Sequence, residues 1–210
     1  MLKLWGRTSS INVRKVLWTL QALQQQTDLA FERVDAGLSF GVVKTPDYLA
    51  KNPNALVPLL EDGSFQLWES NVIVRYLCAK YASGTLYPVD LQKRFEAERW
   101  MDWQQTALNN ASRDAFYQWI RVNPEDRKPA LIAQSVATTE PLLNMVDAQL
   151  ACHAFMAGAH LTMADIPVAC EIHRWWGLPQ PRPAWPNIER WYAQMLAHPA
   201  SRGVLDLPLS

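Results

Sequence analysis

The sequence predicts an α/β domain built on a mixed sheet, followed by a second domain that is entirely helical. Strand and helix patterns alternate over residues 1–82, whereas no strand alternation is present after residue 90. The stretch 83–90 has no hydrophobic period and contains Gly84 and Pro88. We therefore expect a sheet-containing domain over residues 1–82, a linker over 83–90 and a helical bundle over 91–210.

In the first domain, apolar residues either alternate along short segments or recur with the period of a helix. From residue 12 they lie at i, i+3, i+4, i+7 and i+10, which predicts an amphipathic helix. An Asp-Gly-Ser turn between two later apolar runs indicates a hairpin. The expected strands are residues 1–6, 31–35, 57–61 and 65–69, and the expected helices are residues 12–23 and 69–81.

In the second domain the patterns are those of helices only. Pro141 lies inside one of them, where a proline removes a backbone hydrogen bond and favours a kink. The expected helices are residues 91–120, 129–150, 162–176 and 187–196.

Composition and charge exclude several classes of function. Lys plus Arg and Asp plus Glu each number 20, so no net charge favours a nucleic-acid partner. No apolar run reaches the roughly 18 residues of a membrane span, and the first residues lack the pattern of a signal peptide. The three cysteines have no metal-ligand spacing and are expected to be reduced thiols, which indicates a cytoplasmic protein. The four histidines also lack metal-ligand spacing, so no metal is expected.

The polar turn before the first helix is the first candidate site. Ser10 and Asn12 have side chains that commonly cap a helix, and capping is one interpretation of them. The same geometry also favours an anion, to which a hydroxyl can donate a further hydrogen bond. The turn is therefore either a structural cap or an anion site.

Two further segments allow both a structural and a binding role. Pro58 can simply open a strand with a trans bond, whereas a cis bond would turn the backbone of Val57 outward to an extended peptide. Glu69 and Ser70 precede a helix, where they can cap it. Alternatively, Glu69 binds an amine, and Ser70 with the helix N–H groups binds a nearby carboxylate.

A fourth segment, residues 162–166, is best explained structurally. Thr162 is placed to cap the N–H of Asp165, while Asp165 reaches back to it in a variant of the capping box. We expect this pair to start a buried helix correctly.

In this order and spacing, the four segments resemble those of cytosolic glutathione S-transferases, and the resemblance covers essentially the whole chain. It implies a thioredoxin-like N-terminal domain, a helical C-terminal domain, glutathione as co-substrate without a metal, and a homodimer. The turn Gly6-Arg7-x-x-Ser10-x-Asn12-x-x-Lys15 is similar to that of bacterial theta-like or nu-like members. Those members use Ser or Asn, rather than Tyr, near the thiol.

The resemblance also implies roles for individual residues. Ser10 matches the serine that donates to the glutathione thiolate; Asn12 is the reserve candidate, and Ser9 adjoins Ser10 closely enough to take the role instead. The main chain of Val57, before the cis proline Pro58, would pair with the cysteinyl part of glutathione.

The two ends of the tripeptide have their own expected partners. Glu69 and Ser70 match the residues that bind the γ-glutamyl end. Leu56 stands where many members have Lys or Gln for the glycine carboxylate, and Lys44 in the preceding loop is the candidate replacement.

The electrophile is expected between the domains, against the first long helix of the second domain. Asn110, Arg113 and Tyr117 lie at helical spacing beside its apolar stripe, which is typical either of a solvated face or of a pocket wall. We predict that Arg113 binds an anionic electrophile or polarises a leaving group, with Trp103 and Tyr117 as aromatic walls.

The predicted activity is attack of the glutathione thiolate on a small electrophile. Two alternatives on the same fold are an isomerase of the maleylacetoacetate type and a glutathione-dependent disulfide reductase. Ser9 and Ser10 resemble the isomerase's Ser-Ser-Cys pattern, but Ile11 stands in place of its Cys. A third alternative is a non-catalytic dimeric scaffold, against which the presence of Ser10, Glu69 and Ser70 argues.

Overall fold

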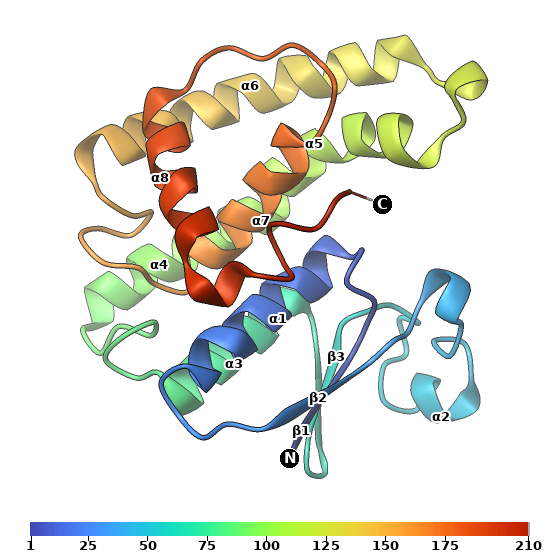
Figure 1. Cartoon of the computed structure of the whole chain (residues 1–210), viewed down its shortest axis with the longest axis vertical. Helices are drawn as coiled ribbons and strands as arrows, with labels where there is room; N and C mark the ends of the chain where they lie inside the picture. The colour runs from blue at the N-terminus through green and yellow to red at the C-terminus, as the bar shows by residue number, and fades with distance from the viewer. Residues whose placement is uncertain (210) are drawn as a thin grey trace.

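The computed structural model describes residues 1–209 and shows a sheet-containing part beside a helical part (Figure 1). The sheet has the strand order β2-β1-β3-β4. β1 is parallel to β2 and antiparallel to β3, and β4 is antiparallel to β3, so the predicted mixed sheet is confirmed. The strands are β1 (Leu2–Trp5), β2 (Phe31–Val34), β3 (Leu59–Asp62) and β4 (Phe65–Trp68).

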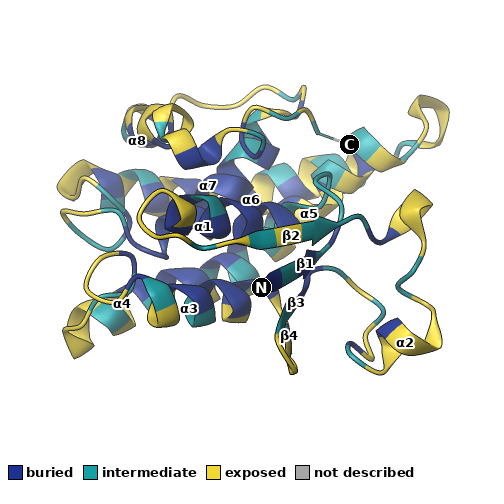
Figure 2. Cartoon of the chain, turned by 60° about the horizontal axis from the view of Figure 1, so that its bottom comes forward, coloured by how far each residue is buried: buried dark blue, intermediate teal, exposed yellow. Residues whose placement is uncertain are grey.

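The two long helices of this part pack on one side of the sheet. α1 (Ile11–Gln24) and α3 (Ser70–Tyr81) lie side by side and share one apolar core with the strands (Figures 1 and 2). Within it, Leu4 of β1 lies opposite Leu60 of β3, and both are fully buried. The short helix α2 (Pro46–Leu49) lies beyond the strands, where Tyr48 packs against Leu59. The second face of the sheet is therefore covered only in part, around Leu59.

The helical part begins with one long run rather than separate helices. The α-helix α4 (Leu91–Trp103) continues through the π-helical turn η2 (Gln104–Leu108) into α5 (Asn109–Phe116). A second π-helical turn, η3 (Tyr117–Arg121), follows α5. This agrees with the single helix predicted over residues 91–120. The other long helices are α6 (Pro129–Cys152), α7 (Asp165–Trp176) and α8 (Pro186–Ala197), and short 3₁₀ turns lie at η1 (Leu38–Phe40), η4 (Pro124–Asp126) and η5 (Pro199–Ser201).

α7 lies at the centre of the molecule. It packs against α1 of the first part, and most of its residues are buried (Figure 2). The predicted boundary at Thr162 is three residues early because residues 162–164 form the cap. Within residues 1–209, no helix combines the length and apolar character needed to cross a bilayer.

The cap of α7 is built around the fully buried Asp165. Its carboxylate accepts from the backbone N–H of Thr162 at 2.9 Å, which confirms that Asp165 reaches back. The Thr162 hydroxyl accepts from the N–H of Ala164 at 3.3 Å instead of that of Asp165, whose N–H donates to the Thr162 carbonyl. Asp165 also accepts from the N–H of Met156 at 2.8 Å and from Nε1 of Trp191 at 2.9 Å. The carboxylate therefore joins three separate segments.

Candidate functional site

Three cavities adjoin one another along the turn between β1 and α1. The central cavity, of about 810 Å³, lies between this turn and the loops on either side of α2. It shares Asn12, Leu56 and Val57 with a side cavity of about 150 Å³, and Arg7 and Ser10 with an arginine cavity of about 120 Å³. Other residues lining them include Lys44 and Thr45 (central), Pro58, Glu69, Ser70 and Gln105 (side), and Arg14, Phe116, Arg121 and Arg174 (arginine).

Ser10, Asn12 and all residues predicted to bind glutathione therefore line the central or the side cavity, whereas Ser9 lines only the arginine cavity. Their individual roles stay predictions, but the structure brings them together from four separate parts of the chain. Ser10 lies where the central and arginine cavities meet.

The turn that carries Ser10 is tight because Gly6 leaves no side chain in its path. A Cβ at Gly6, where φ is +154°, would lie only 2.3 Å from Cγ2 of Val13. Ser10 then takes the N-cap position of α1 in an extended conformation, and its hydroxyl makes no capping hydrogen bond. The capping interpretation is wrong for this residue. Its hydroxyl is left to face the cavities at the positive end of a helix.

The start of α3 is likewise uncapped. Glu69 has φ +73°, an uncommon conformation for a residue with a side chain, and makes no capping hydrogen bond. Its carboxylate is exposed, whereas Ser70 is buried and donates to Oδ1 of Asn12 at 3.2 Å. Uncommon backbone conformations cluster at ligand sites. Both features leave Glu69 and the helix N–H groups available to the side cavity.

The segment before β3 presents an unpaired piece of backbone. The bond between Val57 and Pro58 is cis, which confirms what the resemblance implied and excludes the alternative of a trans bond. Within residues 1–209, neither the N–H nor the C=O of Val57 is paired with another backbone group. The preceding carbonyl of Leu56 is held by the Tyr48 hydroxyl at 2.7 Å and by Nδ2 of Asn52 at 2.9 Å. Val57 is therefore held in place with its own hydrogen-bonding groups free for an extended ligand.

The glycine end of the predicted tripeptide would meet two exposed side chains. Leu56 is 65% exposed and offers no polar group. Lys44 is exposed at the rim of the central cavity. This agrees with Lys44 as the replacement cation, which stays a prediction.

The residues predicted to form the electrophile pocket do not line any of these three cavities. Trp103 stacks edge-on against Trp100 and lines a groove with Met145 of α6. Nδ2 of Asn110 donates to the carbonyl of Thr106, and both Arg113 and Tyr117 are exposed on the surface of the long helix. Their part in electrophile binding stays a prediction.

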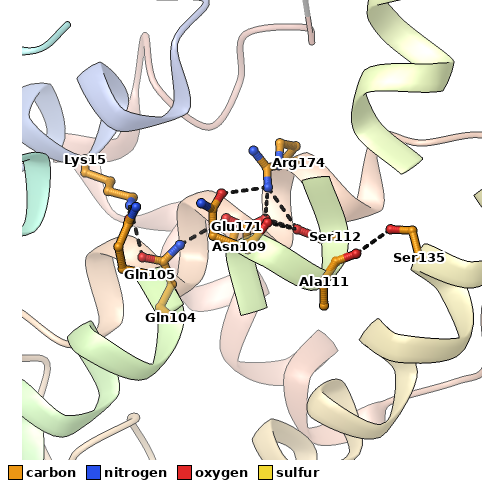
Figure 3. A network of polar contacts seen from close by, with 9 residues as sticks. All are labelled: Lys15, Gln104, Gln105, Asn109, Ala111, Ser112, Ser135, Glu171 and Arg174. Atoms are coloured by element: carbon orange, nitrogen blue, oxygen red, sulfur yellow. Dashed lines mark hydrogen bonds and ion pairs between the residues drawn. The ribbon is translucent and has the colours of Figure 1, made fainter. Parts of the chain in front are cut away.

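A buried polar network links the site to the helical part, and sequence reasoning missed it (Figure 3). Nζ of the fully buried Lys15 donates to the side-chain oxygens of Gln104 and Gln105, each at 3.0 Å. Gln104 donates in turn to Glu171 at 3.0 Å, and Glu171 pairs with Arg174. Burial lowers the pKa of Lys15 to about 8. Since Gln105 also lines the side cavity, the network joins that cavity to α7.

The arginine cavity was also missed. Its guanidinium groups come from the first turn, α1, η3 and α7, so no local sequence pattern predicts that they lie together. The only signal in the sequence is Arg7, in the turn quoted for the resemblance. Within residues 1–209, no group of His, Cys, Asp and Glu is arranged to hold a metal ion.

Comparison with known proteins gives a consistent result along the chain. Residues 1–79 match the family model of the glutathione S-transferase N-terminal domain, and residues 129–194 match that of the C-terminal domain. The chain is 41% identical to glutathione S-transferase GstB of Escherichia coli K12, with all of both proteins covered. It is 32% identical to glutathione S-transferase 3 of Zea mays, covering 99% of this chain and 95% of the relative.

A solved structure is similar over the same extent. The theta class glutathione S-transferase of Xanthomonas axonopodis pv. citri, crystallised with glutathione bound, superimposes with a TM-score of 0.93. The sequences are 39% identical, and the match covers 100% of this chain and 99% of the other.

Proposed function

The chain belongs to the glutathione S-transferase family, and we propose that it conjugates glutathione with the thiol held at Ser10. The observation that carries the proposal is the uncapped Ser10 hydroxyl, which lies between the cavity lined by the predicted glutathione residues and a second cavity. The activity expected from the sequence is also the one named for relatives that match the full chain.

Glutathione lies along the central and side cavities in this proposal. Its γ-glutamyl amine binds Glu69, while the adjacent carboxylate binds Ser70 and the N-terminal N–H groups of α3. Its cysteinyl part pairs with the free backbone groups of Val57, and its glycine carboxylate approaches Lys44. The free hydrogen-bonding groups and the order of these residues along the cavities support this orientation.

The site can supply the energy needed to ionise the thiol. A free thiol has a pKa of about 8.5, and lowering it by about 1.5 to 2 units requires roughly 2–3 kcal/mol. One hydrogen bond to a charged acceptor contributes about 1.5–3 kcal/mol. A helix N-terminus contributes about 0.3–1 kcal/mol. Ser10 at the start of α1 is therefore sufficient.

Once the thiolate has formed, no other protein group has to act on the sulfur. The thiol proton leaves to solvent, the thiolate attacks an electrophilic carbon, and the new S–C bond forms as a leaving group departs with its electron pair. With an activated double bond, the electron pair instead moves onto the acceptor, which takes a proton from solvent.

The alternatives from the sequence are not favoured. The matched relatives are named as transferases, and Ile11 stands where the isomerase pattern has Cys. A scaffold role would leave the free groups of Ser10 and Val57 without a purpose.

Assembly and location are part of the same proposal. A homodimer is supported by large apolar side chains exposed near the junction of the two parts, on β4, α3 and α4, which are Phe65, Trp68, Val72 and Phe95. A cytoplasmic location is supported by three cysteines that are all free thiols. The domain division at residues 82 and 91 is proposed because α3 ends at Tyr81 and α4 begins at Leu91.

The proposal is tested by retention on immobilised glutathione, turnover of an activated chlorobenzene, and a crystal soaked in glutathione. We expect retention, turnover and a sulfur atom within hydrogen-bond distance of Oγ of Ser10. Turnover with the sulfur placed beside Asn12 would transfer the activating role. An empty site together with no turnover would exclude the function.

A further inference from the structure

The arginine cavity meets the central cavity at Arg7 and Ser10 and is rich in cations. Arg7, Arg14, Arg121 and Arg174 line it, and among residues 1–209 no Asp or Glu does so. Its remaining walls include apolar side chains of α1 and α5, Ile11 and Phe116. A cavity with several guanidinium groups and an apolar wall has the chemistry of a site for a small organic anion.

Three of these arginines are already held by the protein, and Arg121 is one of them, with its guanidinium 5.7 Å from the ring centroid of Phe116. Arg14 donates to the carbonyls of Thr8 and Pro208, each at 2.7 Å, and to that of Leu207 at 3.2 Å. Arg174 pairs with Glu171, so its charge is compensated within the buried network (Figure 3).

Arg7 differs from them. Within residues 1–209, its guanidinium makes no hydrogen bond or ion pair, and its Nε is buried without a partner. Desolvation, together with the charge of Arg121, lowers the pKa of Arg7. A buried polar group without a partner costs free energy, which an anionic ligand would recover. Because Arg7 and Ser10 line the same two cavities, such an anion would lie beside the thiol.

We propose that the arginine cavity binds the second substrate, and that Arg7 selects small electrophiles carrying a carboxylate. This inference rests on the proposed function, which places the glutathione sulfur at Ser10. The substrate's carboxylate pairs with Arg7 and its carbon skeleton lies against Ile11 and Phe116. The carboxylate is unchanged in the reaction: the sulfur–carbon bond forms, the leaving group departs with its electron pair, and the thiol proton goes to solvent.

The kinetic test compares two acceptors that differ only in charge, para-chloro-meta-nitrobenzoate and para-chloro-meta-nitrobenzamide. We expect wild type to favour the benzoate in kcat/KM. In Arg7→Gln we expect the benzoate-to-benzamide ratio to fall about 10- to 100-fold, the range for losing a charged hydrogen bond. Arg7→Lys should give an intermediate ratio, because an ammonium keeps the charge without the planar fork. Arg99→Gln, which removes an exposed arginine of α4, is the control and should keep the wild-type ratio.

A binding measurement separates this inference from the proposed function. Meta-nitrobenzoate has no leaving group, so its Kd is measured by calorimetry with and without glutathione. We expect binding that Arg7→Gln weakens about tenfold and that glutathione does not compete away. Competition by glutathione, with a raised KM for glutathione in Arg7→Gln, would assign Arg7 to the glycine carboxylate and overturn the inference. An unchanged benzoate-to-benzamide ratio in folded Arg7→Gln would also overturn it. So would a fall of this ratio by about 10- to 100-fold in Arg113→Gln but not in Arg7→Gln. If wild type turns over neither acceptor but still binds meta-nitrobenzoate through Arg7, the proposed function is contradicted and the carboxylate site is not.

Discussion

The hydroxyl of Ser70 donates a hydrogen bond to Oδ1 of Asn12 at 3.2 Å, and so ties the start of α3 to the turn that carries Ser10. These two residues are 58 positions apart in the sequence. The carboxamide oxygen of Asn12 is occupied by this contact, whereas the Ser10 hydroxyl makes no capping bond. The contact orients the Asn12 side chain at the glutathione site, and the uncapped Ser10 hydroxyl at the start of α1 remains the proposed donor to the thiolate.

We therefore expect Ser10→Ala to lower kcat/KM about 10- to 100-fold, since it removes a hydrogen bond to a charged acceptor. The pKa of the bound thiol should rise toward its free value of about 8.5. Ultraviolet titration of the thiolate in the complex with glutathione measures this shift directly. Ser9→Ala is the matched control. A larger effect in Ser9→Ala than in Ser10→Ala would move the assignment by one residue.

Asn12→Ala should act differently from Ser10→Ala. It removes the acceptor of the Ser70 hydroxyl and loosens the start of α3, so we expect a raised KM for glutathione with the pKa of the bound thiol almost unchanged. The same kinetic and ultraviolet measurements separate the two effects. A thiol pKa that rises only in Asn12→Ala would make Asn12 the activating residue.

Glu69 is expected to bind the amino group of glutathione. Wild type should bind glutathione about tenfold more tightly than the analogue that lacks this amine, because the amine forms a charge-assisted pair with the carboxylate. Glu69→Gln should lose most of this discrimination while still binding the analogue. Calorimetry with both ligands and both proteins gives the four affinities of a double-mutant cycle. Equal discrimination in the two proteins would remove Glu69 from the amine site.

The sequence was sufficient for the fold because both parts follow simple rules. The period of α1 and the turn between β3 and β4 depend only on neighbouring residues, and the π-helical turns η2 and η3 did not disturb the long helix predicted from its stripe. The uncapped state of Ser10 was not predictable, since a capping side chain and a ligand-binding one have the same residue type.

The arginine cavity and the buried network were beyond sequence patterns for another reason. Lys15 meets Gln104 across 89 positions, and Gln104 meets Glu171 across a further 67. A lysine on a helix normally lies at the surface, and the packing of α1 against the helical part buries this one. Such contacts become visible only once the two parts of the molecule are packed together.

Lys15 should make the stability of the protein depend on alkaline pH. Its pKa is about 8 in the folded protein and 10.5 in an exposed lysine, so between these values the unfolded chain binds more protons. Stability therefore rises with pH across this window, by on the order of 3 kcal/mol for this group. Lys15→Met lacks this rise. Urea unfolding of both proteins is measured from about pH 7.5 to about pH 10. The free energy of unfolding of wild type, relative to that of Lys15→Met, should grow over this range. Parallel curves would show that Lys15 is not buried as described.

Asp165 should be among the residues whose loss most destabilises the helical part. Asp165→Ala leaves the N–H groups of Met156 and Thr162 and the Nε1–H of Trp191 without their acceptor. Each buried donor left unpaired costs about 1–3 kcal/mol, so we expect a loss of at least about 3 kcal/mol in the free energy of unfolding. Urea unfolding followed by circular dichroism measures it. Asp165→Asn keeps one acceptor oxygen and should lose less, which keeps the comparison measurable if the alanine variant does not fold.

The pH dependence of the Asp165→Asn difference decides which force dominates at this cap. Burial raises the pKa of Asp165 from 3.8 to about 6, despite the hydrogen bonds from Met156, Thr162 and Trp191 that favour its charged form. Between these pH values the folded protein binds more protons than the unfolded chain, so the contribution of Asp165 to stability falls as the pH rises. The advantage of wild type over Asp165→Asn should therefore shrink from about pH 4 to about pH 6.5, by up to about 3 kcal/mol. An advantage that grows over the same range would mean that the hydrogen bonds outweigh desolvation and that the carboxylate is charged in the core.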